Sequence, residues 1–425
     1  METAFAGITA AGDLALHVHR LWLLLAPAFA LYLGAAGYVL WRPAGSWPLI
    51  LACGLVFRLT LLPSTPSLSD DIYRYIWDGR VQRLGINPYH HAPSAPELAF
   101  LRDELYDGIN HKDVPTIYPP LAQVFFRAAG ALGPQLRTFK VAVVLCEAAL
   151  LLLLVHVLHS RGQDPRRLLL YAWNPLPVIE VAGSGHVDPL GVLLMVTALQ
   201  LLAGGRAAAA GAALAAAVLA KLMPLVLLPL LCLQPAPHGR RPRWRSPSPL
   251  PAFLVVTVLG YALYAAAGPR LFSGLTVYAE RWRFNDALFG PLALLVGLLS
   301  PAEDPQVAGR LVAGVALAGA SVWTAARRSD PFRAALETVG ICLLLSPTLH
   351  PWYLLWILPF MPLFPVPAWV LLTGLTFVAY DVLDDYSTSG RWVEHTWVRW
   401  TQYGPFFALL LAALLRQRLR GFRMP

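Results

Sequence analysis

Long apolar segments recur along this chain of 425 residues and constrain its fold more than any other feature. Leu21 to Trp41 and Phe139 to His159 are each long enough to cross a bilayer as an α-helix, at about 1.5 Å per residue. A globular core cannot bury so much apolar surface, since 57% of the residues are hydrophobic. The sequence therefore predicts an all-α polytopic membrane protein.

Further apolar segments continue this pattern in one integral bundle, which we interpret as a single domain over residues 1–425. Because one crossing needs about 20 residues, they predict roughly eleven to thirteen transmembrane helices. The further candidate crossings are Pro48–Pro63, Leu168–Ala182, Val187–Ala203, Leu250–Ala267, Val307–Ala326, Ala334–Leu349, Trp352–Phe364, Trp369–Tyr380 and Gln402–Leu415.

Two apolar segments contain residues that disfavour a straight crossing. Ile117 to Leu132 holds two prolines and Arg127, so we expect a re-entrant or juxtamembrane helix there. Ala207 to Leu233 is too long for one untilted crossing and is interrupted by Lys221 and Pro224. It predicts two short helices that meet near Lys221.

Arginines gather in clusters beside the apolar segments, which is the positive-inside signal of a plasma or inner membrane protein. We therefore place these clusters, a basic loop over residues 234–249 and the C-terminus in the cytoplasm. This requires that residues 117–132 and 287–299 do not cross fully, and it leaves the side of the N-terminus open. No removable signal peptide is evident there. The clusters are Arg161/Arg166/Arg167, Arg240/Arg241/Arg243/Arg245, Arg327/Arg328/Arg333 and Arg416/Arg418/Arg420/Arg423.

Acidic residues gather between Ser64 and Thr116, in a chain of which only 13% is charged. Residues 64–116 would form a large extracytoplasmic first loop, in which Asp70 to Leu84 has the spacing of an interfacial helix. The net charge of +9 is explained by the cytoplasmic arginines, so nucleic acid is not an expected partner. Of 24 acidic residues, eight lie in this loop: Asp70, Asp71, Asp78, Glu97, Asp103, Glu104, Asp107 and Asp113.

Adjacent carboxylates at the start of this loop are the first candidates for chemistry. Asp70 and Asp71 repel each other, and one of them could act as a general base while the other orients a partner. The alternative, equally weighted, is that both cap the helix that begins at Ile72. A second polar cluster holds His186 and Asp188, which suit a hydroxylated substrate or simply cap the next helix.

Ionised residues beside apolar segments are functional candidates because a charge at membrane depth costs several kcal/mol. Lys221 could hold a lipid phosphate or could extend its ammonium group to the headgroups. Arg281 and Arg283 suit phosphate recognition or an interfacial anchor. His350 and Tyr353 lie in a segment that could equally be part of an aromatic belt, and Glu180 needs a partner in any case.

Metal and nucleotide signals are weak in this sequence. His90, His91 and His111 lie in the acidic loop, but exposed loop histidines are the favoured interpretation over a metal site. The four cysteines lie in apolar segments without CxxC spacing. No cofactor is therefore assigned, a divalent metal is possible but not indicated, and the absence of Walker and GxGxxG loops argues against a nucleotide donor.

Several motifs together resemble the integral-membrane glycosyltransferases of the GT-C superfamily. More narrowly the chain looks like the GT87 group and the bacterial polyprenol-phosphate-mannose-dependent mannosyltransferases, with a more distant similarity to the catalytic subunit of GPI mannosyltransferase I. The matching segments, between Ser69 and Pro359, are DxxxY at Asp71–Tyr75, GxNPY at Gly85–Tyr89, TIYPPLAQ at Thr116–Gln123, WNPLxxxExxGxGHxD at Trp173–Asp188, AKLMPLVLLP at Ala220–Pro229, WRFN at Trp282–Asn285 and SPTLHPWYLLWILP at Ser346–Pro359.

This resemblance implies a GT-C-type bundle that transfers a hexose, with mannose favoured, from a polyprenyl-phosphate carrier to an acceptor hydroxyl of a glycan or glycolipid on the extracytoplasmic side. The base of such enzymes maps to Asp71, by its spacing to Tyr75, with Asp70 as its neighbour, although this pair is contiguous rather than a spaced DxD. The expected substrate-binding residues are Tyr75, Asn87, Tyr89, Tyr118, His186, Asp188, His350 and Tyr353, and the expected phosphate-binding residues are Lys221, Arg281 and Arg283.

Two other classes of function fit parts of the sequence. A secondary transporter or flippase would use Lys221, Asp188 and Glu180 at broken helices near the bilayer midplane. A non-catalytic relative would only bind a lipid-linked sugar. The large acidic outer loop and the absence of a visible internal repeat favour the transferase.

Overall fold

The computed structural model describes residues 1–425 except 43–44, 234–248, 301–303 and 422–425. Regular structure in the described residues is helical, apart from an isolated bridge between Phe284 and Thr348. The N-terminal helices are α1 (Glu2–Ala10), α2 (Val18–Trp41) and α3 (Trp47–Leu61). The acidic loop holds α4 (Asp71–Arg83), η1 (Pro96–Leu101) and α5 (Glu104–Asp107), and α6 (Pro120–Leu132) follows it. The predicted all-α class is confirmed.

The remaining helices form most of the bundle. From residue 136 to 233 they are α7 (Leu136–Ser160), η2 (Pro165–Leu168), α8 (Leu169–Ala172), α9 (Pro175–Pro177), η3 (Val178–Gly183), α10 (Asp188–Ala203), α11 (Ala207–Ala220), η4 (Met223–Leu227) and α12 (Leu228–Leu233). After residue 248 they are α13 (Pro249–Ala262), η6 (Ala265–Phe272), α14 (Ser273–Arg281), α15 (Phe289–Leu299), α16 (Pro305–Arg327), α17 (Pro331–Leu345), η7 (Pro351–Trp356), η8 (Leu358–Phe360), α18 (Pro367–Leu375), η9 (Thr376–Asp381), α19 (Val382–Ser389) and α20 (Thr396–Gly421).

Length and apolar composition identify four helices in the described residues that could span a membrane. They are α2, α7, α16 and the continuous segment Pro367–Ser389, and a fifth would combine α13 with Ala265–Arg281 across a bend of 103°. Six shorter apolar helices of 10–17 residues accompany them. The chain is thus a polytopic membrane protein, whereas the number of eleven to thirteen crossings stays a prediction.

Prolines decide where several of the predicted crossings break. The segment Ala207–Leu233 divides as predicted: α11 ends at Ala220, Lys221 is extended, and a new helix begins at Met223. The prediction of a continuous helix over Leu168–Ala182 is wrong. Pro175 and Pro177 interrupt its hydrogen-bond ladder, and the chain forms the short pieces η2, α8, α9 and the π-helix η3 instead.

The second predicted crossing that the structure breaks is Trp352–Phe364. It is wound as the 3₁₀ pieces η7 and η8 followed by turns, and both pieces begin next to a proline. The juxtamembrane segment forms α6, which packs on α4 and is not among the apolar helices of spanning composition. The expectation of a helix from Asp70 to Leu84 is confirmed by α4.

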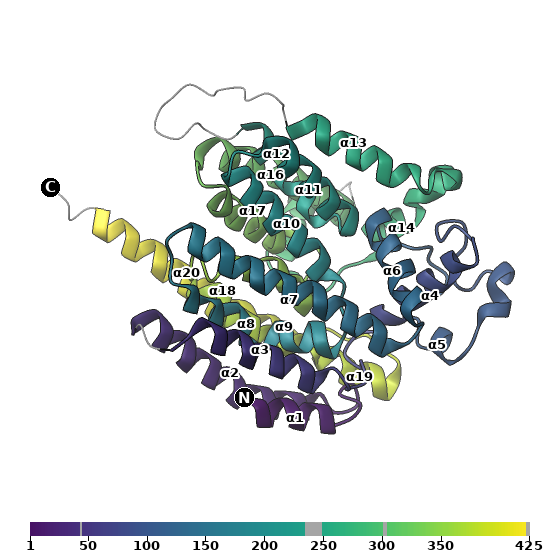
Figure 1. The fold of residues 1–425 in the computed structure, drawn as a ribbon, viewed down its shortest axis with the longest axis horizontal. Coiled ribbons are helices and arrows are strands. Elements are labelled where there is room, and N and C mark those ends of the chain that lie inside the picture. The colour runs from purple at the N-terminus through teal and green to yellow at the C-terminus, as the bar shows by residue number, and fades with distance from the viewer. Residues whose placement is uncertain (43–44, 234–248, 301–303, 422–425) are drawn as a thin grey trace.

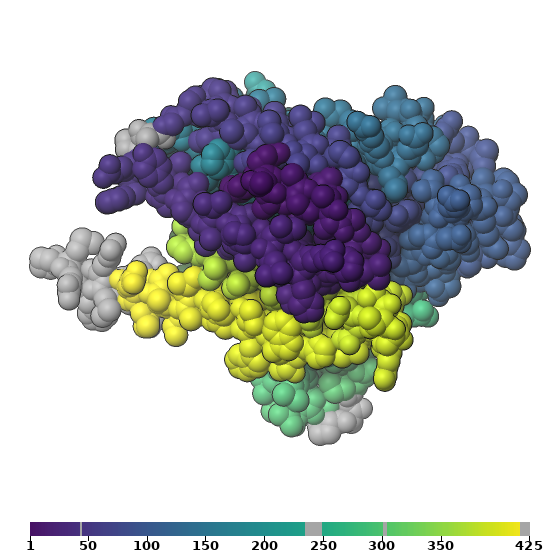
Figure 2. All heavy atoms as spheres, turned by 90° about the horizontal axis from the view of Figure 1, so that it is seen from below, coloured from purple at the N-terminus to yellow at the C-terminus, as the bar shows by residue number. Residues whose placement is uncertain are grey.

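The bundle has two distinct ends (Figure 1). Helices α4, α5 and α6 gather at one end, and the C-terminal part of α20 extends from the opposite end. Figure 2 shows N-terminal residues beside the C-terminal segment on one face, with residues of the acidic loop at the end of the molecule. Arg161, at the end of α7, pairs with Asp330 at the start of α17, so two of the arginine clusters lie on the same side.

A buried ion pair connects helices in the interior of the bundle. Arg58 of α3 donates to both carboxylate oxygens of Glu147 on α7, at 2.7 and 2.6 Å, and neither side chain is exposed. Arg58 also donates to the carbonyl of Ala172, the last residue of α8. Removing one partner of such a pair leaves a buried charge unpaired, at a cost of about 3–5 kcal/mol. Three apolar helices are thereby held in one relative position.

The predicted basic loop over residues 234–249 lies outside the described residues except for Pro249, and so does its arginine cluster.

Candidate active site

Helix α4 starts at the point where the acidic loop leaves the bundle, and its first residue is Asp71. Asp70 occupies the N-cap position, yet its side chain makes no capping hydrogen bond. The interpretation of the pair as helix caps therefore loses its physical basis. The two carboxylates also differ in position, because Asp71 lines a pocket while Asp70 is exposed at the surface.

The pocket beside Asp71 has an empty volume of about 670 Å³, including space open to solvent. Its lining residues come from α4, the acidic loop and the residues that follow it, the end of α11, α14, and η7 with the residue before it. Its lining consists of Asp71, Arg74, Asn110, His111, Val114, Pro115, Ile117, Tyr118, Lys221, Tyr278, Trp282, His350, Trp352 and Tyr353.

Two cationic side chains of the pocket are held firmly in place. Lys221 donates to both carboxylate oxygens of Asp188, at 2.7 and 2.8 Å, and its ammonium lies 5.1 Å from the ring centre of Tyr353. Arg74 donates to Asp78 and to the carbonyl of Val114, both at 2.9 Å. Each cation therefore has a fixed direction, and 21% of the Lys221 side chain is exposed.

Aromatic rings form one wall of the pocket. Trp352 is stacked between His350, at 4.2 Å between ring centres, and His186, at 4.0 Å. The hydroxyls of Tyr278 and Tyr353 lie 2.6 Å apart. Rings with polar edges suit the faces and hydroxyls of a sugar. Burial lowers the pKa of His350 to about 3, so this ring is neutral and can both donate and accept a hydrogen bond.

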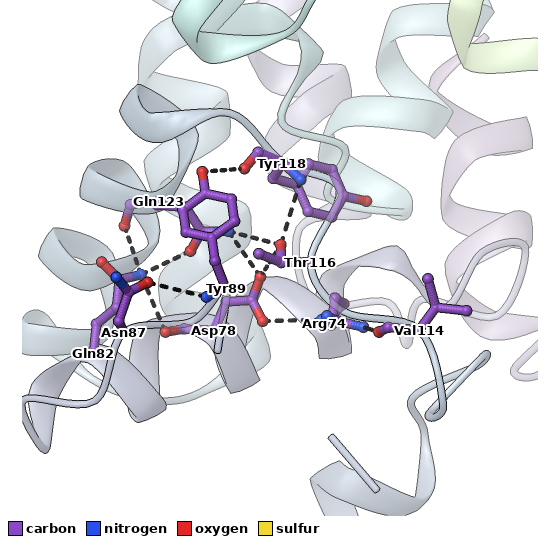
Figure 3. A network of polar contacts seen from close by, with 9 residues as sticks. All are labelled: Arg74, Asp78, Gln82, Asn87, Tyr89, Val114, Thr116, Tyr118 and Gln123. Atoms are coloured by element: carbon purple, nitrogen blue, oxygen red, sulfur yellow. Dashed lines mark hydrogen bonds and ion pairs between the residues drawn. The ribbon is translucent and has the colours of Figure 1, made fainter. Parts of the chain in front are cut away.

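A buried polar network behind the pocket attaches α4 to the segment that follows the acidic loop (Figure 3). One carboxylate oxygen of Asp78 accepts from Thr116 and Gln123, at 2.6 and 2.9 Å, while the other accepts from Arg74. Gln82 donates to Gln123 at 2.8 Å. Buried polar groups of this kind hold one arrangement because an unpaired group is costly.

The same network fixes one predicted residue of the pocket and places two others behind it. The Tyr89 hydroxyl donates to the carbonyl of Tyr118 at 2.7 Å, and the Asn87 side chain accepts from the amide of Tyr89 (Figure 3). Tyr118 lines the pocket, whereas Tyr89 and Asn87 do not. Tyr75 is buried as well, with its hydroxyl 3.4 Å from Asp71.

Four other predicted site residues lie outside the pocket lining. His186 and Asp188 are fully buried, His186 behind Asp71 and Asp188 beneath Lys221. The Arg281 side chain is 65% exposed and lies 3.9 Å from Asp113, and Arg283 pairs with Asp286 at 2.7 Å. The pocket thus brings together Asp71, Tyr118, Lys221, His350 and Tyr353.

The environments of the two aspartates shift their pKa values in opposite directions. Burial raises the pKa of Asp71, but the nearby His186 and Lys221 outweigh this effect and leave the pKa below its ordinary value. Asp70 is exposed, yet the surrounding protein still removes part of its water. This desolvation, together with the charge of Asp71, raises the pKa of Asp70 to about 6. Asp71 is therefore ionised at neutral pH.

Sequence reasoning missed three polar residues of the pocket, Arg74, Asn110 and Tyr278. Arg74 follows Asp71 by three residues and precedes Asp78 by four, spacings that place all three on one helix face. That periodicity was available in the sequence. The position of Tyr278 depends on the bend before α14 and has no local signal. Among the described residues, no group of three or more His, Cys, Asp or Glu side chains is arranged to hold a metal ion.

Comparisons with known proteins point to one family. Residues 5–237 match the family described as alpha-(1->6)-mannopyranosyltransferase, N-terminal domain. The chain is also similar to the alpha-(1->6)-mannopyranosyltransferase A of Mycobacterium tuberculosis (strain ATCC 25618 / H37Rv), with 26% identity over 334 residues. That match covers 72% of this chain and 63% of the mycobacterial relative, so the chain spans less than two thirds of the relative's length. No solved structure matches the chain.

Proposed function

The chain belongs to the family of the alpha-(1->6)-mannopyranosyltransferase N-terminal domain, and we propose that it transfers mannose from a polyprenyl-phosphate carrier to an acceptor hydroxyl. The acceptor is a glycan or glycolipid on the extracytoplasmic side of the plasma or inner membrane. The mannosyl group is supported by the matched family and by the name of the mycobacterial relative. The lipid carrier and the reaction steps rest on the chemistry of the pocket.

The observation that carries this proposal is the placement of an ionised carboxylate and fixed cations in one pocket. Asp71 and Arg74 of α4 line it together with Lys221, which follows α11. A carboxylate that is ionised at neutral pH can accept a proton. Cations whose directions are fixed stabilise a phosphate as its negative charge grows. Transfer from a sugar phosphate to an acceptor hydroxyl uses both groups. The carboxylate accepts the proton of the hydroxyl, and the cations stabilise the phosphate that leaves.

The proposed reaction is an in-line displacement at the anomeric carbon. The acceptor oxygen forms a bond to this carbon while the bond from the carbon to the carrier phosphate oxygen breaks. The proton of the acceptor hydroxyl moves to Asp71, and the electron pair of the broken bond leaves with the polyprenyl phosphate. No acid is needed for the leaving group, since Lys221 and Arg74 stabilise its charge.

Phosphate recognition is assigned to Lys221 and Arg74 rather than to the exposed Arg281 and the paired Arg283. Lys221 precedes η4 at a break between two short apolar helices, so a lipid phosphate could reach it from the bilayer. The Nε and one terminal nitrogen of Arg74 donate hydrogen bonds to Asp78 and to the carbonyl of Val114. These bonds fix the orientation of its guanidinium group. Tyr118, His350 and Tyr353 remain the proposed contacts of the sugar.

Purified full-length protein, labelled polyprenyl-phosphate mannose and α-1,6-linked mannosyl acceptors would test this proposal. We expect Asp71→Asn to lower transfer by about 100- to 10,000-fold, the usual contribution of a general base. Binding of the labelled donor and the thermal midpoint should stay close to those of the parent protein. Asp107→Asn, an exposed acidic residue of the same loop, is the matched control.

Full activity of Asp71→Asn would remove Asp71 as the base, and loss of activity in Asp70→Asn alone would assign that role to Asp70. Reconstituted vesicles supply the second readout. Movement of the labelled lipid across the vesicle membrane without product formation would contradict the transferase and favour a flippase.

A further inference from the structure

A line of buried polar side chains runs from Asp71 into the interior of the bundle. His186 Nδ1 lies 3.5 Å from a carboxylate oxygen of Asp71, and His186 Nε2 lies 3.5 Å from a carboxylate oxygen of Glu180. The other oxygen of Glu180 accepts from the Tyr380 hydroxyl at 2.8 Å. Neither His186 nor Glu180 is exposed, and Tyr380 is 3% exposed.

The backbone and an aromatic ring hold His186 in this position. Gly185 has a φ of +80°, which lets the chain turn sharply after η3. The amide of His186 donates to the carbonyl of Glu180 at 3.1 Å, and the imidazole is stacked on Trp352 at an interplanar angle of 19°. The ring plane is therefore fixed, with one nitrogen toward each carboxylate.

The two middle members of this line, His186 and Glu180, are short of hydrogen bonds. Within the described part of the chain, His186 Nδ1, His186 Nε2 and Glu180 Oε2 have no hydrogen-bond partner, although all three atoms are buried. Buried polar atoms without partners are rare and costly. A small closing movement would bring both nitrogens within hydrogen-bond distance of the carboxylates.

The two ring nitrogens of His186 face two carboxyl groups, those of Asp71 and Glu180. A neutral imidazole donates one hydrogen bond, whereas an imidazolium donates two and can serve both carboxylates. Among the other titratable groups nearby, Lys221 is paired with Asp188, and His350 across Trp352 is neutral. Lys140, which packs against Gly185, donates to the carbonyls of Leu61 and Ser64. His186 therefore remains free to serve the carboxyl groups of Asp71 on α4 and Glu180 on η3.

We propose that His186, backed by Glu180 and Tyr380, is the positioning residue of Asp71: it directs that carboxylate into the pocket and keeps it ionised until the acceptor binds. This inference rests on the proposed function of Asp71. The proton of the acceptor passes to Asp71 and leaves through the pocket. His186 thus acts through Asp71 and touches no substrate, which differs from the substrate-binding role that the sequence predicts.

The pH dependence of transfer tests this role. The contact with His186 lowers the pKa of Asp71, so His186→Gln should move the acidic limb of kcat/KM upward by about 1–2 pH units. At neutral pH kcat should fall about 10- to 100-fold, with the KM for the donor within about twofold of the parent. Glu180→Gln, which retains an acceptor for Tyr380, should move the limb in the same direction by a smaller amount.

Tyr32→Phe is the matched control because Tyr32 is buried in the same bundle, and its hydroxyl bonds to Leu170 and Asn174 rather than to Asp71, His186 or Glu180. Its acidic limb should stay in place. A His186→Gln or Glu180→Gln enzyme with reduced kcat and an unmoved limb would overturn the proposal and indicate a purely structural role. If His186→Gln fails to fold, the isosteric Glu180→Gln decides alone.

Failure of this inference is distinguishable from failure of the proposed function. Suppose that Asp71→Asn abolishes transfer while His186→Gln and Glu180→Gln keep the acidic limb of the parent protein. Then only the positioning role of His186 is wrong. If Asp71→Asn stays active, the assignment of Asp71 as the base is wrong. Any shift of the acidic limb in His186→Gln would then report the pKa of another group.

Discussion

Lys221 shows how a charge is tolerated and directed beside apolar helices. Its ammonium has two bonds to Asp188, and Asp188 also accepts from the indole nitrogen of Trp356 at 2.6 Å. Asp188 is fully buried, and without a partner its carboxylate would destabilise the fold. The ion pair with Lys221 removes much of this cost. The ammonium keeps one face toward the pocket. A cation held in this way can recognise a phosphate without first losing conformational freedom.

Substitution of Lys221 tests whether this cation binds the lipid phosphate. We expect Lys221→Gln to lower kcat/KM for the polyprenyl-phosphate donor by about 10- to 100-fold, the range for a hydrogen bond to a charged group. The measurement is initial-rate kinetics with a varied donor at saturating acceptor.

Arg281→Gln is the comparison, since the Arg281 side chain is 65% exposed and outside the pocket lining. It should change kcat/KM by less than about threefold, as removal of an exposed charge usually does. Equal losses in both variants would contradict the assignment of the phosphate to Lys221 and return Arg281 to the site.

At the scale of elements, the pocket depends on how α4 is joined to residues 114–123. Asp78 has the central place in this junction, because it accepts from Arg74 on its own helix and from Thr116 and Gln123 across the interface. Gly79 makes the close approach of α4 to α6 possible, since a Cβ there would lie 2.4 Å from the carbonyl oxygen of Phe126. The junction positions Arg74 and Tyr118 together.

Asp78→Asn should destabilise the protein and impair transfer. An amide cannot accept from three donors at once, and it leaves the Arg74 charge without its buried counter-ion. We expect the free energy of unfolding to fall by about 2–4 kcal/mol and kcat/KM to fall with it. Thermal unfolding in detergent and the transfer assay provide the two measurements.

Asp103→Asn is the matched control in the same loop. Asp103 pairs with Arg80 at 2.9 Å, but its side chain is 48% exposed, so its loss should cost less than about 1 kcal/mol. If Asp78→Asn were as mild as this control, the buried network would not be what holds α4 against residues 114–123.

The acidic loop and the C-terminal part of the chain lie at opposite ends of the molecule (Figure 1). Helices α4 to α6 lie at the first of these ends, and the C-terminal part of α20 lies at the other. The pairing of Arg161 with Asp330 joins two of the arginine clusters near the ends of α7 and α16. This arrangement fits a pocket on the outer side and arginines in the cytoplasm.

Single cysteines at the two ends would test that orientation. In a background without the four native cysteines, we expect Glu104→Cys to react with a membrane-impermeant maleimide in intact cells. Ser329→Cys should react only after the membrane is permeabilised, because it lies among the arginines expected in the cytoplasm. Both native residues are exposed. The opposite pattern of labelling would place the pocket in the cytoplasm.

Much of this protein follows from the sequence alone. Apolar length predicts the helical membrane bundle, and Pro224 with Lys221 predicts the break between α11 and η4. These are local effects, since hydropathy, proline geometry and the cost of a charge act within one segment. The same reasoning identified Asp71, Lys221, His350 and Tyr353 as candidates from their chemistry and position along the chain.

Only the tertiary structure decided which of these candidates share a pocket. Asp71 and Lys221 are 150 positions apart, and nothing in their local segments states that they meet or that Arg281 stays outside. It also decided that His186 lies between Asp71 and Glu180 rather than in the pocket. Such pairings arise from the packing of whole helices, where burial and mutual hydrogen bonds select one arrangement among many that the local sequence permits.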